Sequence, residues 1–104
     1  MAALSTRVTE LKKRGKRVML VGDFNTVRGP SDAFDWKQQP EREKMQGLAT
    51  WEREEFENLI VTHGFHDMLE VNARRAPSDN YTWFPQQLRN ARKHRHGRRL
   101  DYVL

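Results

Sequence analysis

The chain has 104 residues, and 19 Lys and Arg against 14 Asp and Glu give it a net charge of +5. This length suggests one small domain or part of a larger one, and the basic balance favours polyanionic partners. Because the chain has no cysteine, a disulfide framework and a thiolate metal site are excluded. No apolar stretch approaches the roughly 20 residues that span a bilayer, and the N-terminal MAALSTRVTE lacks a secretory core. We therefore expect an intracellular protein without membrane contact, nuclear in a eukaryote and cytoplasmic otherwise.

A helix and a buried strand are the first predicted elements. Leu4, Val8 and Leu11 recur at helical spacing, and Gly15 follows a basic last turn, which predicts the helix end. Residues 17–22 form an apolar run, which is typical of a strand buried on both faces. A helix that leads into such a strand predicts an α/β fold.

Residues 26–49 lack periodicity and predict a long irregular loop, either functional or mobile. We expect Thr50 to act as the N-cap of a second helix that ends at Gly64, with Phe65 folding back on it. Four residues share the face of this helix that should be buried: Phe56, Leu59, Ile60 and His63.

The last third of the sequence predicts two strands joined by a basic connection. Residues 77–80 have turn composition, and residues 81–84 have strong strand preference that Pro85 ends. Residues 86–98 are polar and basic. Residues 99–104 then predict a final strand with one apolar face, made of Leu100, Tyr102 and Leu104.

Asp23 and Asn25 stand at the end of the first predicted strand, where open α/β sheets bind ligands. A carboxylate there can act as a general base or a metal ligand, and a carboxamide can donate to a phosphoryl oxygen. Along an extended segment, side chains two residues apart lie on the same side. The alternative is a local Asx turn in which both side chains bond nearby amides, and the pattern alone favours that turn.

The segment from Arg89 to Arg99 carries six Lys and Arg, two His and no acid. It is either a solvated basic surface or, with the aromatic residues 81–84 beside it, a nucleic-acid-binding surface. His94 and His96 could instead bind a metal, but without a neighbouring Cys or carboxylate this interpretation is the weaker one.

Asp101, in the last predicted strand, directly follows two arginines and a leucine. It either pairs with Arg98 or Arg99, or it orients a catalytic histidine as carboxylates do in triads. We expect Asp101 to lie at the same end of the sheet as Asp23, so that both face one phosphate.

Four ordered motifs together resemble the exonuclease III type of AP endonuclease, in the endonuclease/exonuclease/phosphatase superfamily. The motifs are Gly22-Asp23-Phe24-Asn25, Tyr81-Thr82-Trp83-Phe84, Asn90-Ala91-Arg92 and Arg99-Leu100-Asp101-Tyr102. The first is shared across the superfamily, whereas the ordered set is more specific. The resemblance covers about residues 11–104.

The resemblance implies a role for each matched residue. Asp23 would activate the attacking water, Asn25 would hold the phosphate, and Asp101 would bond the catalytic histidine. Asp23 and Asn25 would also contribute to binding Mg²⁺, or Mn²⁺ in its place. Six residues would contact the substrate: Trp83, Asn90, Ala91, Arg92, Arg98 and Leu100.

For the whole chain, the resemblance implies a four-layered α/β sandwich of two packed sheets. Residues 1–104 would be a fragment of that single domain, incomplete at both ends. The implied activity is metal-dependent hydrolysis of DNA phosphodiester bonds in DNA repair, by AP endonuclease or 3′-exonuclease action. The implied partner is duplex DNA with an abasic or damaged site, and nothing in the sequence indicates a homo-oligomer.

The family's metal-binding Glu and its closing Ser-Asp-His motif have no match in this sequence. We therefore expect the 104-residue chain by itself to lack activity. Two other interpretations stay open. One is a retroelement-type endonuclease or another phosphatase of the superfamily, and the other is a non-catalytic basic module that binds nucleic acid.

Overall fold

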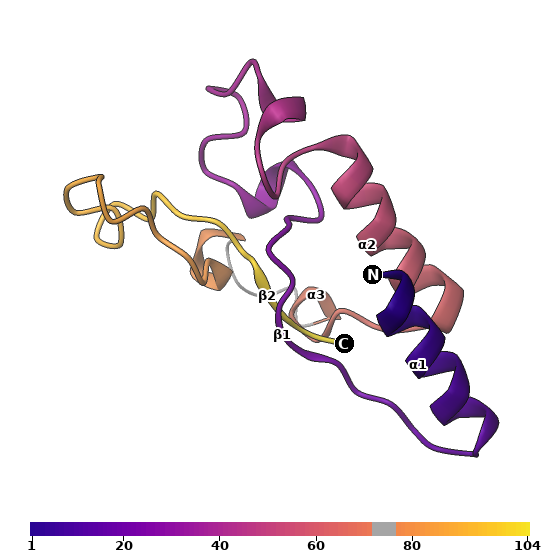
Figure 1. The fold of residues 1–104 in the computed structure, drawn as a ribbon. Coiled ribbons are helices and arrows are strands. Elements are labelled where there is room, and N and C mark those ends of the chain that lie inside the picture. Colours follow the sequence, from indigo (N-terminus) through magenta and orange to yellow (C-terminus); the bar gives the residue numbers. More distant parts are fainter. Residues whose placement is uncertain (72–76) are drawn as a thin grey trace.

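The computed structural model describes residues 1–71 and 77–104, and within them the chain forms a small α/β structure (Figure 1). The helices and strands are α1 (Ala2–Lys13), β1 (Val21–Asp23), α2 (Thr50–His63), α3 (Met68–Val71) and β2 (Asp101–Val103). Short 3₁₀ helices are η1 (Pro30–Asp32), η2 (Arg42–Lys44) and η3 (Pro77–Asn80). In this part of the chain no helix is both long and apolar enough to cross a bilayer.

β1 and β2 pair antiparallel, although they lie far apart in the sequence. Their register joins Val21 to Val103, Gly22 to Tyr102 and Asp23 to Asp101. Backbone hydrogen bonds extend the ladder in both directions, since Leu20 and Leu104 exchange two of 3.2 and 2.9 Å and Phe24 donates to Leu100 at 2.9 Å. The predicted α/β class is confirmed. The described residues form this one sheet, so the four-layered sandwich stays a prediction.

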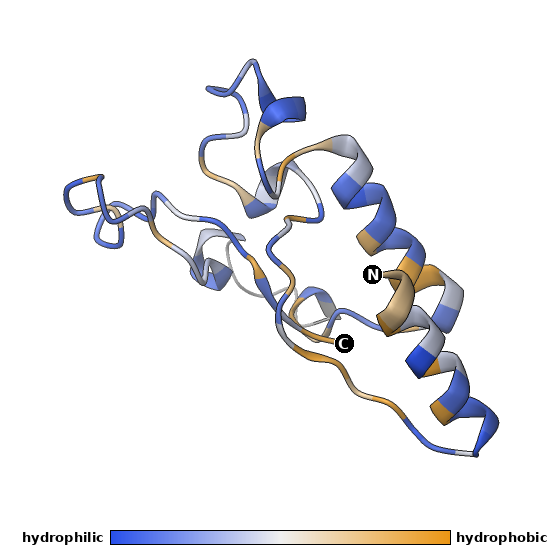
Figure 2. Ribbon diagram, viewed as in Figure 1, coloured by the Kyte–Doolittle hydropathy of each residue, from blue (hydrophilic) through white to orange (hydrophobic). Residues whose placement is uncertain are grey.

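The prediction that the first strand is buried on both faces is wrong. Met19 and Val21 are 69% and 68% exposed, whereas Leu20 and Phe24, which alternate with them, pack into the core. The helices cover only one face of the sheet, and the apolar run therefore has one buried and one exposed side (Figure 2).

The main core lies between this covered face and α2. Phe56 and Tyr102 are almost fully buried, with ring centroids 4.7 Å apart and an edge-on arrangement. Phe24 stacks on Phe56 at 5.0 Å. Burying a side chain of this kind contributes about 1.5–3 kcal/mol, so these three rings fix how α2 lies on the sheet.

α1 and α2 lie side by side, and their predicted inner faces are largely confirmed (Figure 1). Val8 is buried on α1, and Phe56, Leu59 and Ile60 are buried on α2. His63 is only partly buried, because its ring bonds the Ser5 hydroxyl of α1 at 2.8 Å instead of packing into the core.

The ends of α2 agree with the sequence at one terminus only. Gly64 ends the helix in a left-handed conformation, with φ of 67°, as predicted. Thr50 is not the N-cap, because Ala49 occupies that position. The Glu43 carboxylate accepts bonds from the Thr50 amide at 2.8 Å and the Thr50 hydroxyl at 2.6 Å. These bonds from Thr50 lower the pKa of Glu43.

Residues 26–49 are irregular, as predicted, and they pack into the protein. The Val27 amide donates to the Gly47 carbonyl at 3.0 Å, which closes the two ends of the loop. Val27, Leu48 and Leu100 then form a second buried cluster with Ala33. The loop therefore connects β1 to α2 along the chain, and it also packs against Leu100, the residue before β2.

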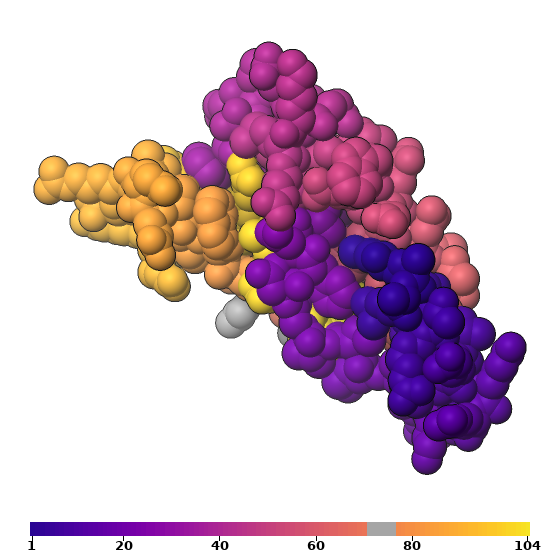
Figure 3. Space-filling view, in the orientation of Figure 1, coloured from indigo at the N-terminus to yellow at the C-terminus, as the bar shows by residue number. Residues whose placement is uncertain are grey.

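Residues 81–84 do not form the predicted strand. Trp83 makes one isolated bridge with Arg98, and the same Arg98 also bridges Ala33. Residues 85–97, called the arm below, follow this bridge and project from the body (Figure 3). The arm is mostly hydrophilic, contains turns and returns to β2 (Figure 2).

We expect Tyr102→Phe to flatten the dependence of stability on alkaline pH. The buried Tyr102 hydroxyl bonds the carbonyls of Thr26 and Arg99, at 2.9 and 3.0 Å, and burial raises the pKa of Tyr102. An unfolded tyrosine ionises near pH ~10, so the folded state loses stability as the pH rises above that value. Urea unfolding between neutral and alkaline pH measures this slope.

The variant should also lose about 0.5–1.5 kcal/mol at neutral pH with the hydrogen bond. Equal alkaline slopes for the variant and the natural chain would contradict this account of Tyr102.

Candidate functional site

Asp23 and Asp101 lie directly opposite each other on the exposed side of the sheet. The bonded pairs on either side of them make this a non-hydrogen-bonded pair, in which side chains approach most closely. Like charges in such a position are unfavourable. Among the described residues neither carboxylate has an ion-pair partner. The pair is therefore suited to a bound cation or a hydrogen-bond donor.

The predicted placement of Asp23 and Asp101 at one end of the sheet is thus confirmed. Their catalytic roles stay predictions. Of the two alternatives for Asp101, the pairing with Arg98 or Arg99 is not observed, because both arginines bind other carboxylates, as described below.

Asn25 follows Asp23 in a sharp turn. Its φ of 54° is a left-handed conformation, which asparagine adopts more readily than most residues. The Asn25 amide donates to Asp23 Oδ1 at 2.7 Å, so the alternative of a local Asx turn is confirmed for Asp23. The argument that both side chains share one side assumed an extended segment, and the bend at Asn25 removes that assumption.

This turn still leaves groups that can bind a ligand. One oxygen of Asp23 and the carboxamide of Asn25 make no hydrogen bond within the described part of the chain, and both residues are exposed. Gly47 packs against the turn, and a Cβ at this position would lie 2.9 Å from the Asn25 carbonyl oxygen. The absence of a side chain at Gly47 thus lets the backbone of Asn25 lie close against the loop.

Arg99 is buried and joins three parts of the chain. Its guanidinium donates twice to Asp32, both at 3.0 Å, and to Asp67 at 2.8 Å. It also lies over the Tyr102 ring, 4.5 Å from the centroid. Bidentate bonds of this kind suit the planar guanidinium, and they hold β2 against the loop and the start of α3.

Arg28 extends the same network toward α2. It contacts Glu57 at 2.9 Å, Asp67 at 3.4 Å and, in addition, Glu70. Asp67 therefore lies between two arginines, and its side chain is fully buried.

Arg98 makes its own bidentate pair with Asp35, at 2.6 and 3.2 Å. The adjacent arginines thus bind two aspartates that are three positions apart in the loop. Sequence reasoning did not identify Asp32, Asp35 and Asp67 as partners. The only available signal was this matching pattern of two arginines and two aspartates.

The six predicted substrate contacts are not all accessible. Leu100 and Ala91 are 6% and 5% exposed, so their placement gives no support to a contact with substrate. Trp83 is 41% exposed, and the guanidinium of Arg98 lies 5.5 Å from its ring. Because Arg98 is already paired with Asp35, it is not a free cation for phosphate.

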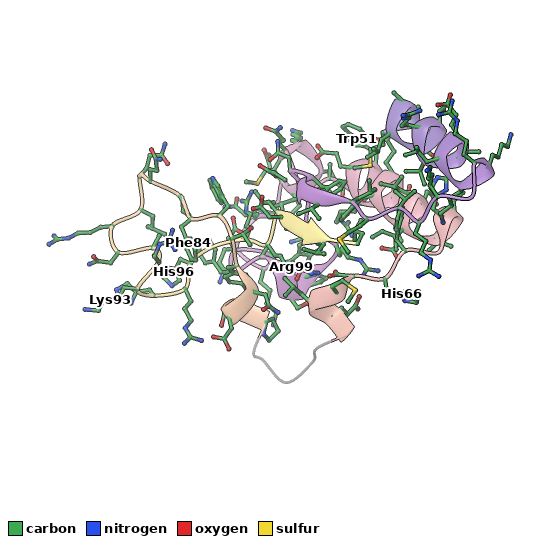
Figure 4. All side chains as sticks on the ribbon, turned by 90° about the horizontal axis from the view of Figure 1, so that it is seen from below. Trp51, His66, Phe84, Lys93, His96 and Arg99 are labelled. Carbon is green, nitrogen blue, oxygen red and sulfur yellow. The ribbon has the colours of Figure 1, made fainter. Side chains whose placement is uncertain are left out.

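Asn90 and Arg92 lie on the arm, and side chains of the arm contact aromatic rings that lie outside it. Arg92 covers the Phe84 ring at 4.7 Å, and His96 stacks on Phe34 at 4.8 Å. Lys93 lies at the outer part of the arm, whereas Arg99 lies in the body (Figure 4).

Ion pairing divides the predicted basic segment. Arg95 pairs with Asp79, and Arg98 and Arg99 are paired as described. Three cations of the segment have no ion-pair partner within residues 1–71 and 77–104: Arg89, Arg92 and Lys93. Within this segment, the cations that can attract a polyanion are therefore fewer than the sequence predicts, and they lie on the arm.

The described residues hold no group of three or more His, Cys, Asp and Glu that could bind a metal by themselves. The weaker interpretation of His94 and His96 as a metal site therefore receives no support. Mg²⁺ commonly binds one or two carboxylates together with waters and substrate phosphates. The opposed carboxylates of Asp23 and Asp101 fit that incomplete kind of site, not a closed one.

The chain is thus a small α/β structure with two opposed carboxylates at one end of its sheet, the Asn25 turn beside them, and unpaired cations on the arm. Residues 2–104 match the model of the endonuclease/exonuclease/phosphatase family, and the chain belongs to this family. Members of the family are hydrolases that act on phosphodiester bonds and generally use divalent metals. A search of the curated proteins finds no match.

Asp67→Asn is expected to destabilise the chain by about 3–5 kcal/mol, because it removes the carboxylate shared by the buried Arg99 and the partly buried Arg28. Asp79→Asn is the matched control, since its pair with Arg95 is exposed, and we expect a loss below about 1 kcal/mol. Urea unfolding of both variants tests the comparison. Similar losses would show that the buried network does not hold the fold.

Gly47→Ala is expected to displace Asn25 and to cost about 1–3 kcal/mol, because φ is 85° and the new Cβ would meet the Asn25 carbonyl. Gly29→Ala is the control, since φ is −168° and a Cβ added there would meet no atom within 4 Å. Amide NMR shifts of Asn25 and unfolding free energies report the two effects. An unmoved Asn25 amide in the Gly47 variant would refute the role given to Gly47.

Proposed function

We propose that this chain carries part of the active site of a metal-dependent phosphodiesterase of the exonuclease III type. The substrate is duplex DNA with an abasic site or a damaged 3′ end. The reaction is hydrolysis of a phosphodiester bond.

The observation that supports this proposal best is the pairing of Asp23 with Asp101 beside the Asn25 turn. Two carboxylates opposite each other, without an ion-pair partner in the described residues, are an electrostatic cost to the folded chain. A divalent cation and a substrate phosphate would relieve that cost. Such a cost is typical of sites where function outweighs stability.

In this proposal each polar group has a defined part in the reaction. Asp23, held by the Asn25 amide, accepts the proton of the attacking water through its free oxygen. The Asn25 carboxamide donates to a phosphoryl oxygen without adding negative charge. Asp101 is a positioning residue, because it orients the groups of the active site that transfer protons.

A divalent metal, when bound, would neutralise charge that develops on the phosphate. Asp23, Asn25 and Asp101 are the residues of this chain that would hold it. The remaining ligands would be waters and the substrate itself.

The arm contributes affinity for the DNA backbone. Arg89, Arg92 and Lys93 supply its unpaired cations, and Phe84 supplies a ring beside Arg92. Contacts of this kind position the duplex without reading its sequence.

The test measures how the chain binds a labelled duplex that contains an abasic analogue, by fluorescence anisotropy with Mg²⁺ and with EDTA. We expect the natural chain to bind the duplex about tenfold more tightly in Mg²⁺ than in EDTA. We expect the Asp23→Ala variant to bind with the same affinity in Mg²⁺ and in EDTA. Affinity should fall with salt, with a slope of roughly −0.9 for each phosphate contacted. We expect no strand cleavage by this chain alone.

The Asp23 variant and competitors distinguish the other interpretations. A purely basic module would bind the duplex equally well in Mg²⁺ and in EDTA. Its Asp23→Ala variant would bind the duplex as tightly as the natural chain does. If the chain were a lipid phosphatase, phosphoinositide vesicles would compete with the DNA and displace it. Strand cleavage by the natural chain that disappears in Asp23→Ala would support the proposed reaction and overturn the expected lack of activity.

A further inference from the structure

Trp51 is a large aromatic side chain on the outer side of α2. It is 63% exposed, whereas Phe56, Leu59 and Ile60 of the same helix are buried. A single exposed tryptophan is not unusual by itself. Its surroundings are unusual, because Trp51 borders a pocket that also reaches Asn25.

This pocket has a volume of about 410 Å³, within the range of small-molecule sites. The turn after β1 and the first turns of α2 line it together with Met1, which precedes α1, and Trp51 lies on the α2 side. Its polar lining is made of Asn25, Thr26, Gln46, Glu52 and Glu55.

The charges of the residues that line the pocket disfavour an anionic ligand. Glu52 and Glu55 give the lining two carboxylates, against one cationic group, the N-terminal amine of Met1. A phosphate is therefore disfavoured inside the pocket, although Asn25 at its edge can donate to one. A neutral group that presents N–H donors is favoured.

The lining is also partly fixed in place. Glu52 accepts the Gly47 amide at 2.7 Å, so its carboxylate is held against the loop. Glu55 has no side-chain hydrogen bond within the described residues and can accept one from a ligand. An aromatic face beside such acceptors matches a nucleobase, whose ring stacks while its amino and imino groups donate.

We propose that the pocket between Trp51 and Asn25 binds an unpaired nucleobase of the nucleotide next to the phosphate held by Asn25. Trp51 stacks on the base, and Glu55 accepts a hydrogen bond from its exocyclic amino group. The inference rests on the proposed function, because the phosphate at Asn25 sets where the base lies. It assigns a base-binding subsite to the turn that also handles phosphate.

The test uses a single-stranded oligonucleotide with an abasic analogue flanked by 2-aminopurine, a fluorescent base that stacking quenches. We expect quenching on binding to the natural chain, partial quenching with Trp51→Phe and none with Trp51→Ala. Affinity should fall about tenfold in Trp51→Ala, as stacking on an aromatic side chain provides. Val61→Ala is the matched control, because Val61 is 69% exposed on the same helix and does not line the pocket.

Two outcomes would overturn the inference, and they differ in what they say of the proposed function. If the natural chain binds the oligonucleotide with the Mg²⁺ dependence given above but shows no quenching, the base subsite is refuted alone. The same holds if Trp51→Ala binds and quenches like the natural chain. If the natural chain binds neither oligonucleotide nor duplex, both proposals fail together.

Discussion

The buried guanidinium of Arg99 is the constraint on which the rest of the structure depends. It connects β2 to Asp32 of the loop and to Asp67 before α3, so three distant segments converge on one side chain. With only two short strands and two small apolar clusters in the described residues, the fold has little other material to hold these segments together. A buried charge must be paired almost completely, and this requirement fixes the geometry more narrowly than apolar packing does.

That geometry determines where the candidate site lies. Arg99 directly precedes the Leu100-Asp101 step, so its anchoring sets the register of β2 against β1. The register in turn places Asp101 opposite Asp23. Arg98 and Arg99 turn inward to their own aspartates, and the two carboxylates of the pair are therefore left for a ligand. Because the two arginines that precede Asp101 in the sequence are already paired, they do not neutralise the carboxylates of Asp23 and Asp101.

Most local features of this fold were predictable from sequence, and most long-range contacts were not. Gly64 and the buried face of α2 follow from helix periodicity and left-handed glycine, which involve neighbouring residues only. Thr50 failed as a cap because Glu43, from the preceding loop, supplies the carboxylate. The exposure of Val21 could not be inferred, since an apolar run does not reveal how many faces of a sheet are covered. The placement of Asp23 and Asp101 was anticipated from motif order.

The division of the arginines between body and arm separates two kinds of recognition. Arg28, Arg98 and Arg99 of the body are paired with aspartates, so they supply no free charge for binding a substrate. Arg89, Arg92 and Lys93 of the arm have no ion-pair partner among the described residues, and binding of a polyanion there depends on salt and not on base identity. The acidic pocket beside Trp51 has the opposite character, because it disfavours phosphate and offers acceptors and a ring. The turn at Asn25 lies at its edge, so one short segment can place a phosphate and a base by different physical means.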